Sequence, residues 1–145
     1  RSNQAGVARG YYTEDDVKEL HRYMNELLAG QGVKIDAFYY CPHHPEHGIG
    51  KYKVRCHCRK PETGMFEMAE QDFAVDKASS WMIGDKLIDM EAGRNYGVRT
   101  VLVGTGYGAG VHEEQKKKGD FPYDLYADDL LEAYNEINRE TAGNL

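Results

Sequence analysis

Two short segments of the sequence hold all three cysteines and four of the six histidines. Cys41 and His43 are separated by one residue, and twelve residues later Cys56 and Cys58 repeat that spacing. Two close ligand pairs joined by a loop are typical of a zinc site, although the gap within a pair is usually wider. Three thiolates and one imidazole would complete a tetrahedral shell. Such a shell leaves no position for water, so the zinc would be structural.

The same residues allow a simpler interpretation, in which the three cysteines are unrelated free thiols. Disulfides are not expected if the protein is cytoplasmic. Spacing alone does not decide between His43 and His44 as the fourth ligand. The other histidines of the two segments, His47 and His57, are expected to be exposed or to lie beside the metal site.

A basic pair, Arg59-Lys60, directly follows the last cysteine. A metal that fixes Cys58 would also fix these two cations, which could then face an anionic ligand. The alternative is an exposed basic pair without a partner.

Two carboxylates accompany a third cation in the segment Ile83-Gly84-Asp85-Lys86-x-x-Asp89. Asp85 follows an expected strand, and Asp89 lies one helical turn further on. Oxygen ligands at a strand end suit Mg²⁺, and Lys86 could hold a phosphate oxygen as a point charge. Taken alone, however, this pattern also fits an ordinary turn followed by a helix cap.

The segment Ser2-Asn3-Gln4 offers a hydroxyl, two amides and main-chain N–H groups within one loop. Donors of this kind suit a phosphoryl group during transfer. A polar loop by itself carries little information.

Strands and helices are expected to alternate along the chain. The hydrophobic pattern predicts strands at 35–40, 80–83, 100–103 and 123–126, and helices at 13–29, 63–73, 87–96 and 128–139, joined by an irregular stretch over 42–62. This order predicts a Rossmann-like α/β domain with a mainly parallel sheet and helices on both faces. Function collects at the carboxyl ends of such strands, which points to Cys41, Asp85 and Gly104-Thr105-Gly106, and to Ser2-Asn3-Gln4 if a strand precedes it.

Composition limits the functional classes. With 145 residues the chain is expected to be one domain, 1–145, with its zinc loop at 41–60. The net charge of −6 argues against nucleic acid as a partner. No apolar run approaches the roughly 20 residues that span a membrane. No secretory signal pattern opens the sequence, so a cytoplasmic location is expected. A monomer is the default expectation.

Taken together, these segments resemble the haloacid dehalogenase superfamily of Mg²⁺-dependent phosphatases. The resemblance is greatest to its zinc-containing branch, the D-glycero-D-manno-heptose 1,7-bisphosphate 7-phosphatases, with histidinol-phosphate phosphatases as near relatives. The motifs that carry it follow the family order and span most of the chain: S-N-Q-A-G-V-A-R-G at 2–10, Y-Y-C-P-H-H-P at 39–45, C-H-C-R-K-P at 56–61, M-I-G-D-K-x-x-D at 82–89 and R-T-V-L-V-x-T-G-Y-G at 99–108.

The resemblance implies a role for each group. Structural zinc would be bound by Cys41, His43, Cys56 and Cys58. Catalysis and substrate binding would involve Ser2, Asn3, Gln4, Ala5, Arg59, Lys60 and Lys86. Of these, Ser2 and Lys60 would stabilise the phosphoryl group, and Arg59 would recognise the substrate. Asp85 would bind Mg²⁺, and Asp89 would support the magnesium site without contacting the ion. The implied substrate is a small sugar phosphate.

One family motif is missing from residues 1–145. The resemblance implies an Asp-x-Asp motif on a first strand, in which one Asp attacks phosphorus and the other acts as acid and base. No such pair occurs here, and Ala5 stands where relatives often have Ser. We therefore expect the N-terminal strand that carries the nucleophile to lie outside these residues. The alternatives are a histidinol-phosphate phosphatase and a non-catalytic, zinc-stabilised binding module.

Overall fold

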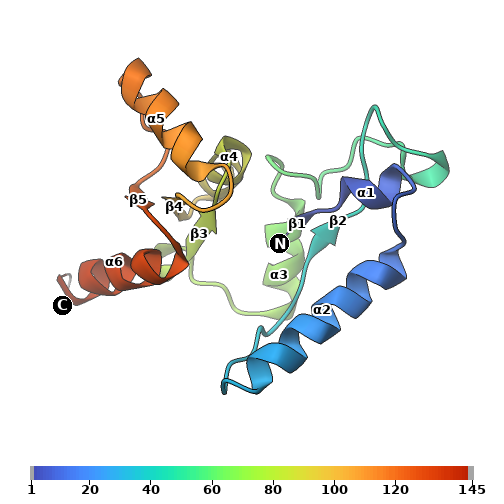
Figure 1. Ribbon diagram of the computed structural model, residues 1–145, viewed down its shortest axis with the longest axis horizontal. Helices are drawn as coiled ribbons and strands as arrows, with labels where there is room; N and C mark the ends of the chain where they lie inside the picture. Colours follow the sequence, from blue (N-terminus) through green and yellow to red (C-terminus); the bar gives the residue numbers. More distant parts are fainter. Residues whose placement is uncertain (1, 144–145) are drawn as a thin grey trace. The chain divides into compact units, whose positions relative to one another are not determined.

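The structure is a computed structural model that describes residues 2–143 (Figure 1). The chain forms two compact units, Arg1–Ala74 and Val75–Leu145. Each unit is built around its own small parallel sheet. The expectation of one domain over 1–145 stays a prediction.

The first unit contains the zinc-loop motifs. Its elements are β1 (Ser2–Asn3), α1 (Ala5–Ala8), α2 (Glu14–Ala29), β2 (Tyr40–Cys41), a 3₁₀ turn (Gly50–Tyr52) and α3 (Gly64–Asp72). β1 and β2 pair in parallel, with Ser2 opposite Tyr40 and Asn3 opposite Cys41. The pairing therefore places the end of the Ser2-Asn3-Gln4 segment beside the first cysteine.

The expected strand at 35–40 is much shorter in the structure, where only Tyr40–Cys41 is a strand. A strand exists only where a partner supplies hydrogen bonds, and β1 offers just two residues. Ile35 is bound instead by an asparagine side chain. Asn25 Oδ1 accepts from Ile35 N at 2.9 Å, and Asn25 Nδ2 donates to Ile35 O at 3.1 Å.

Threonine and aspartate side chains cap the starts of two helices, and another threonine does not cap its helix. Thr13 Oγ1 accepts from Asp16 N at 3.1 Å and Asp16 Oδ2 accepts from Thr13 N at 2.8 Å, a complete capping box at α2. Asp129 Oδ1 accepts from Glu132 N at 2.8 Å at the start of the last helix. Thr63 precedes α3, but its hydroxyl donates to a glutamate side chain rather than capping the main chain.

The second unit holds a three-stranded sheet of order β3-β4-β5, parallel throughout. Its elements are a 3₁₀ turn (Lys77–Ser79), β3 (Trp81–Gly84), α4 (Leu87–Tyr96), β4 (Arg99–Val103), α5 (Gly108–Lys118), β5 (Leu125–Ala127) and α6 (Leu130–Gly143). The three strands lie within two residues of their predicted bounds, and Gly97 caps the end of α4 in the left-handed conformation.

Helices cover both faces of this sheet, as the sequence predicts. Side chains alternate between faces along a strand. Val101 and Val103 of β4 are buried on one face against Ala133 of α6. Thr100 points to the other face, where a Cβ on Gly93 of α4 would lie 2.7 Å from the Thr100 methyl group. Only glycine allows α4 to approach the sheet this closely.

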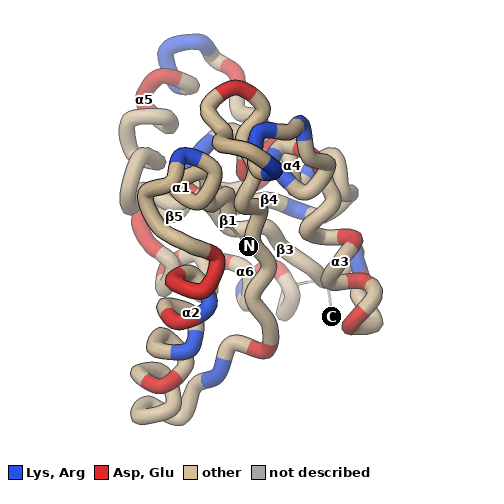
Figure 2. Tube along the Cα trace, turned by 90° about the vertical axis from the view of Figure 1, so that its right-hand side faces the viewer, with Lys and Arg blue, Asp and Glu red and all other residues tan. Residues whose placement is uncertain are grey.

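Two helices were not predicted. α1 directly follows the Ser2-Asn3-Gln4 segment, outside the predicted elements, and α5 contains helix-breaking glycines at Gly108 and Gly110. α5 is held by aromatic packing: the His112 ring stacks on Tyr126 with 3.7 Å between centroids, and His112 Nδ1 lies 2.6 Å from the Tyr123 hydroxyl. Its last turn is the basic run of three lysines (Figure 2).

Within residues 2–143, no helix is both long enough and apolar enough to cross a membrane.

Candidate metal centre and phosphate-binding groups

Four side chains converge in the first unit in the geometry of a metal site. The ligand atoms of Cys41, His43, Cys56 and Cys58 all lie within 4.8 Å of one another. His43 Nδ1 lies 3.7 Å from Cys41 Sγ and 3.8 Å from Cys58 Sγ. A tetrahedral zinc with ordinary Zn–S and Zn–N bonds would separate its ligand atoms by about 3.5–3.8 Å. The donor set and its spacing therefore fit zinc.

The main chain brings the two cysteine pairs together. Cys41 ends β2 and is fully buried. The second pair lies in a tight turn, in which Cys56 Sγ accepts from Cys58 N at 3.3 Å. Gly64, the first residue of α3, lies directly against this turn. A Cβ at this position would lie only 2.6 Å from the main-chain oxygen of His57. The start of α3 thus supports the second pair from behind.

Without a cation the three thiols cannot all ionise easily. Burial raises the pKa of the Cys41 thiol. Burial, together with the neighbouring thiols, also raises the pKa of Cys58 strongly. Burial acts the same way on Cys56, but hydrogen bonds from Cys58, Cys41 and the Arg59 main chain together outweigh it and lower the pKa of Cys56 overall. A bound divalent cation would stabilise all three thiolates at once.

The side chains of two further histidines of the loop are engaged elsewhere. His44 Nδ1 accepts from the main-chain N–H groups of Glu46 and His47, at 3.1 and 3.0 Å. His57 Nε2 lies 2.8 Å from a carboxylate oxygen of Glu67. The structure therefore brings His43, and not its neighbours, into the cluster.

The zinc loop is joined to β1 through an asparagine. Asn3 Oδ1 accepts from Lys60 N at 3.0 Å, and Asn3 Nδ2 donates to Lys60 O at 3.4 Å. Arg59 Nη1 donates to His43 O at 3.5 Å, and the Lys60–Pro61 peptide bond is cis. Both cations are partly buried. Ser2, Asn3, Arg59 and Lys60 are thus brought together within one unit, while Ala5 begins α1 next to them.

A glutamate that the sequence motifs do not indicate supports the same loop. Glu14, the first residue of α2, accepts hydrogen bonds from the Tyr40 hydroxyl at 3.0 Å and from the Tyr52 hydroxyl at 2.8 Å. The bond from Tyr52 is the main reason that the pKa of Glu14 lies below its usual value. Tyr52 O in turn accepts from His44 N at 3.0 Å. No local pattern identifies this contact, because its partners are 26 and 38 residues away.

In the second unit, Asp85 follows β3 and is held by the Gly-rich loop. Asp85 Oδ2 accepts from Tyr107 N at 3.1 Å. Gly106 has a φ of +62°, and a Cβ there would lie 2.3 Å from the same oxygen. The loop therefore needs glycine for two reasons, the left-handed backbone and the close carboxylate.

The other two predicted residues of this segment lie beside Asp85. Asp89 is buried, and its Oδ2 accepts from Lys86 N at 3.2 Å at the start of α4. A Cβ on Gly84 would lie 2.4 Å from Asp89 Cβ, so the strand end and the helix start are in close contact. Lys86 Nζ lies 4.6 Å from the centre of the Tyr107 ring. The structure thus gathers Asp85, Lys86 and Asp89 within the second unit.

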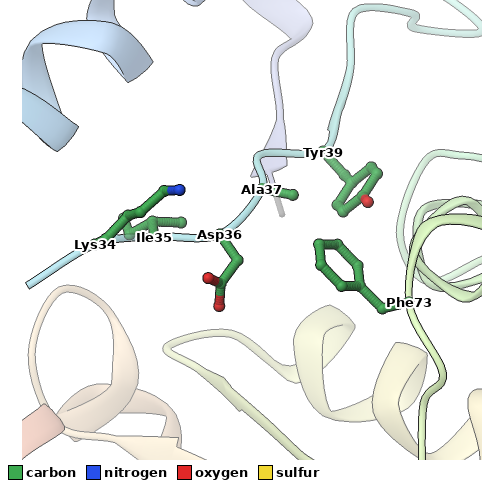
Figure 3. Close-up of a pocket in the computed structure, with 6 residues that line it drawn as sticks. All are labelled: Lys34, Ile35, Asp36, Ala37, Tyr39 and Phe73. Atoms are coloured by element: carbon green, nitrogen blue, oxygen red, sulfur yellow. The ribbon is translucent and has the colours of Figure 1, made fainter.

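A separate pocket of about 340 Å³ lies in the first unit (Figure 3). Its lining residues are Lys34, Ile35, Asp36, Ala37, Tyr39 and Phe73. The rings of Tyr39 and Phe73 face each other there, and the Tyr39 hydroxyl donates to Asp72 at 2.5 Å. None of the lining residues is a predicted site residue.

Comparison with known proteins places the chain in a family. A protein-family model described as HAD-hydrolase-like matches residues 57–133, which is more than half of the chain. The chain belongs to the HAD-hydrolase-like family. The matched stretch includes Cys58, Lys60, Asp85 and Asp89, so the family assignment of this HAD-hydrolase-like chain rests on residues from both units.

Two curated relatives are named as heptose-1,7-bisphosphate 7-phosphatases. The chain is 49% identical over 102 residues to the D-glycero-alpha-D-manno-heptose-1,7-bisphosphate 7-phosphatase of Burkholderia mallei, covering 70% of this chain and 54% of that protein. It is 44% identical over 137 residues to the D-glycero-D-manno-heptose-1,7-bisphosphate 7-phosphatase of Chlorobaculum tepidum, covering 91% and 67%. The HAD-hydrolase-like chain thus spans about half to two thirds of the length of these relatives.

A solved structure shares the fold. The crystal structure of D,D-heptose 1,7-bisphosphate phosphatase from B. bronchiseptica, complexed with magnesium and phosphate, matches with a TM-score of 0.78 and 31% identity. The match covers 96% of this HAD-hydrolase-like chain and 73% of the other. The predicted Rossmann-like α/β fold is therefore confirmed.

Proposed function

We propose that the protein is a Mg²⁺-dependent phosphatase that removes the 7-phosphate from D-glycero-D-manno-heptose 1,7-bisphosphate through an aspartyl-phosphate intermediate. The observation that carries this proposal is the 44% identity to a phosphatase of that name over 91% of the chain. The magnesium and phosphate bound by the B. bronchiseptica enzyme support the same chemistry.

In this proposal, each group of the first unit acts on the phosphoryl group or on the sugar. The Ser2 hydroxyl and the Lys60 ammonium bind phosphoryl oxygens, where negative charge increases during transfer. Arg59, with its planar donors, recognises the rest of the substrate together with Asn3, Gln4 and the start of α1 at Ala5. The hydrogen bonds between Asn3 and Lys60 keep the lysine main chain at the end of β1.

Asp85 of the second unit is the proposed magnesium ligand, and Lys86 contacts the substrate. Bound Mg²⁺ would neutralise charge on the transferring phosphoryl group. Asp89 does not contact the ion in this proposal. Its buried carboxylate fixes the first turn of α4, which begins two residues after Asp85.

The proposal assigns the covalent step to an Asp-x-Asp pair that is not among residues 1–145. One carboxylate would attack phosphorus and the other would protonate the leaving sugar oxygen. The second carboxylate would then take a proton from the water that hydrolyses the aspartyl phosphate, which releases inorganic phosphate. Placement of this pair on a strand ahead of Ser2 follows from the family resemblance.

Structural zinc in the Cys41, His43, Cys56 and Cys58 cluster would order the loop that carries Arg59 and Lys60. Four protein ligands leave no open position, so the metal takes no part in the reaction. That the protein acts as a cytoplasmic monomer stays a prediction.

The test is phosphate release by the full-length protein from heptose 1,7-bisphosphate in the presence of Mg²⁺, with histidinol phosphate as a second substrate. We expect release from the bisphosphate, much less from histidinol phosphate, and none from the Asp85→Asn variant. Lys60→Ala should lower kcat/KM. Release from histidinol phosphate alone would reassign the substrate. Binding of the bisphosphate without any turnover would instead make the protein a binding module.

A further inference from the structure

A chain of hydrogen bonds leads from a tyrosine on the α1–α2 connection to Ser2. The Tyr12 hydroxyl donates to Gln4 Oε1 at 2.6 Å, and Gln4 Nε2 donates to Ser2 Oγ at 2.9 Å. The two bonds occupy opposite ends of the Gln4 amide. Tyr12 is therefore connected to the Ser2 hydroxyl through a single side chain.

The direction of these bonds leaves the Ser2 proton available for another acceptor. A serine hydroxyl has one proton and can accept as well as donate. Because Ser2 Oγ accepts from Gln4, its own proton remains available for another acceptor. The reverse orientation of the amide would turn Oε1 toward Ser2 and take up that proton. Donation from Tyr12 to Oε1 favours the first orientation.

Packing holds the Tyr12 ring where it can make this contact. A Cβ on Gly6 of α1 would lie 2.2, 2.4 and 2.6 Å from Cε1, Cζ and the hydroxyl oxygen of Tyr12. The ring therefore lies directly on the α1 main chain, in space that only glycine leaves open. On its other side, Tyr12 precedes Thr13, which is fixed by the capping box of α2. The neighbouring Tyr11 is 74% exposed.

We propose that Tyr12 is a positioning residue that, through Gln4, directs the Ser2 hydroxyl proton toward an oxygen of the transferring phosphoryl group. The inference rests on the proposed phosphatase function and names a residue outside the family motif set described above. A donor that is already aimed costs no reorganisation when charge develops in the transition state. Its loss should therefore affect kcat more than KM.

The first experiment compares Tyr12→Phe with Tyr11→Phe in the full-length protein, using heptose 1,7-bisphosphate and Mg²⁺. Each variant removes one hydroxyl and keeps the ring. We expect Tyr12→Phe to lower kcat by about two- to tenfold, the range that one hydrogen bond provides, with little change in KM. Zinc content should equal that of the wild type. Tyr11→Phe should match the wild type throughout.

The second experiment asks whether the effect passes through Ser2. Ser2→Ala removes the hydroxyl that Tyr12 is proposed to orient, so adding Tyr12→Phe to it should cause no further loss of kcat. An equal additional loss in the double variant would overturn the inference, as would a wild-type kcat for Tyr12→Phe alone. A wild-type protein that releases no phosphate would instead refute the proposed function, so the two failures are distinguishable.

Discussion

The side chain of Asn3 hydrogen-bonds to both main-chain polar groups of Lys60, a residue 57 positions away. This contact fixes the cation that follows the last cysteine to the end of β1. Zinc ligands, β1 and the two basic residues therefore form one connected structure. The position of Lys60 therefore depends on Asn3 as well as on the cysteine pair that precedes it.

Replacing Asn3 with alanine should lower both stability and activity. Loss of two partly buried hydrogen bonds should reduce the free energy of unfolding by about 1–2 kcal/mol, measured by urea denaturation. The Lys60 main chain would also lose its anchor, so kcat/KM should fall. Asn25→Ala is the matched control, because Asn25 makes the same pair of bonds to Ile35. It should cost similar stability with unchanged kcat/KM, and equal losses of activity in both variants would contradict the role of Asn3.

The sequence predicts the elements whose signals are local. α4 and its Gly97 cap, the capping box at Thr13 and the strands β3 and β4 follow from periodicity and capping residues. The run at 35–40 has strand-forming residues but almost no partner, and pairing is not a local property. α5 shows the opposite case, since it forms despite its glycines and packs through the stacking of His112 on Tyr126, a contact that is not local.

The residues of the candidate site also differ in whether a local sequence signal identifies them. Spacing alone indicates a zinc site, and the resemblance selects His43, the histidine that the structure brings into the cluster. Contacts between distant residues had no sequence signal: Asn3 with Lys60, and Glu14 with Tyr52. Each depends on how the chain folds back on itself, which residue types and spacing do not specify.

Cys58→Ser should release zinc, whereas His57→Ala should retain it. Cys58 Sγ lies within the ligand cluster, and the His57 side chain pairs with Glu67 outside it. Zinc binding contributes directly to folding stability, so the serine variant should also melt at a lower temperature. The measurements are zinc content by atomic spectroscopy and thermal unfolding with and without a chelator. A serine variant with wild-type zinc content would remove Cys58 from the ligand set.

Glu14→Gln should remove a pH-dependent part of the stability. The bond from Tyr52 lowers the pKa of Glu14 below its usual 4.5, so the folded state binds this proton less readily than the unfolded state. The ionised carboxylate therefore stabilises the protein above pH 4.5, and that contribution is lost as the pH falls through the lowered pKa. The difference in melting temperature between wild type and Glu14→Gln should be largest near neutral pH and should shrink in acid.

Asp15→Asn provides the control for that measurement. Asp15 also lies in the first turn of α2, so both variants lose a charge that interacts with the helix dipole. Only Glu14 accepts from the two tyrosine hydroxyls. Equal pH profiles for the two variants would show that the helix dipole, and not the tyrosine contacts, accounts for the effect.

Gly106→Ala should weaken magnesium binding through Asp85, and Gly119→Ala should not. Both glycines have positive φ, +62° and +66°, so each alanine should cost about 1–2 kcal/mol of stability. At Gly106 the new Cβ would also lie 2.3 Å from Asp85 Oδ2, whereas nothing lies within 4 Å at Gly119. The displaced carboxylate should raise the Mg²⁺ concentration for half-maximal activity by about tenfold or more. Losing a group that orients a metal-binding side chain usually has an effect of this size. Protection against thermal unfolding by Mg²⁺ gives a second readout that does not need turnover. If both variants keep the wild-type Mg²⁺ dependence, Asp85 is not the magnesium ligand that the proposed mechanism requires.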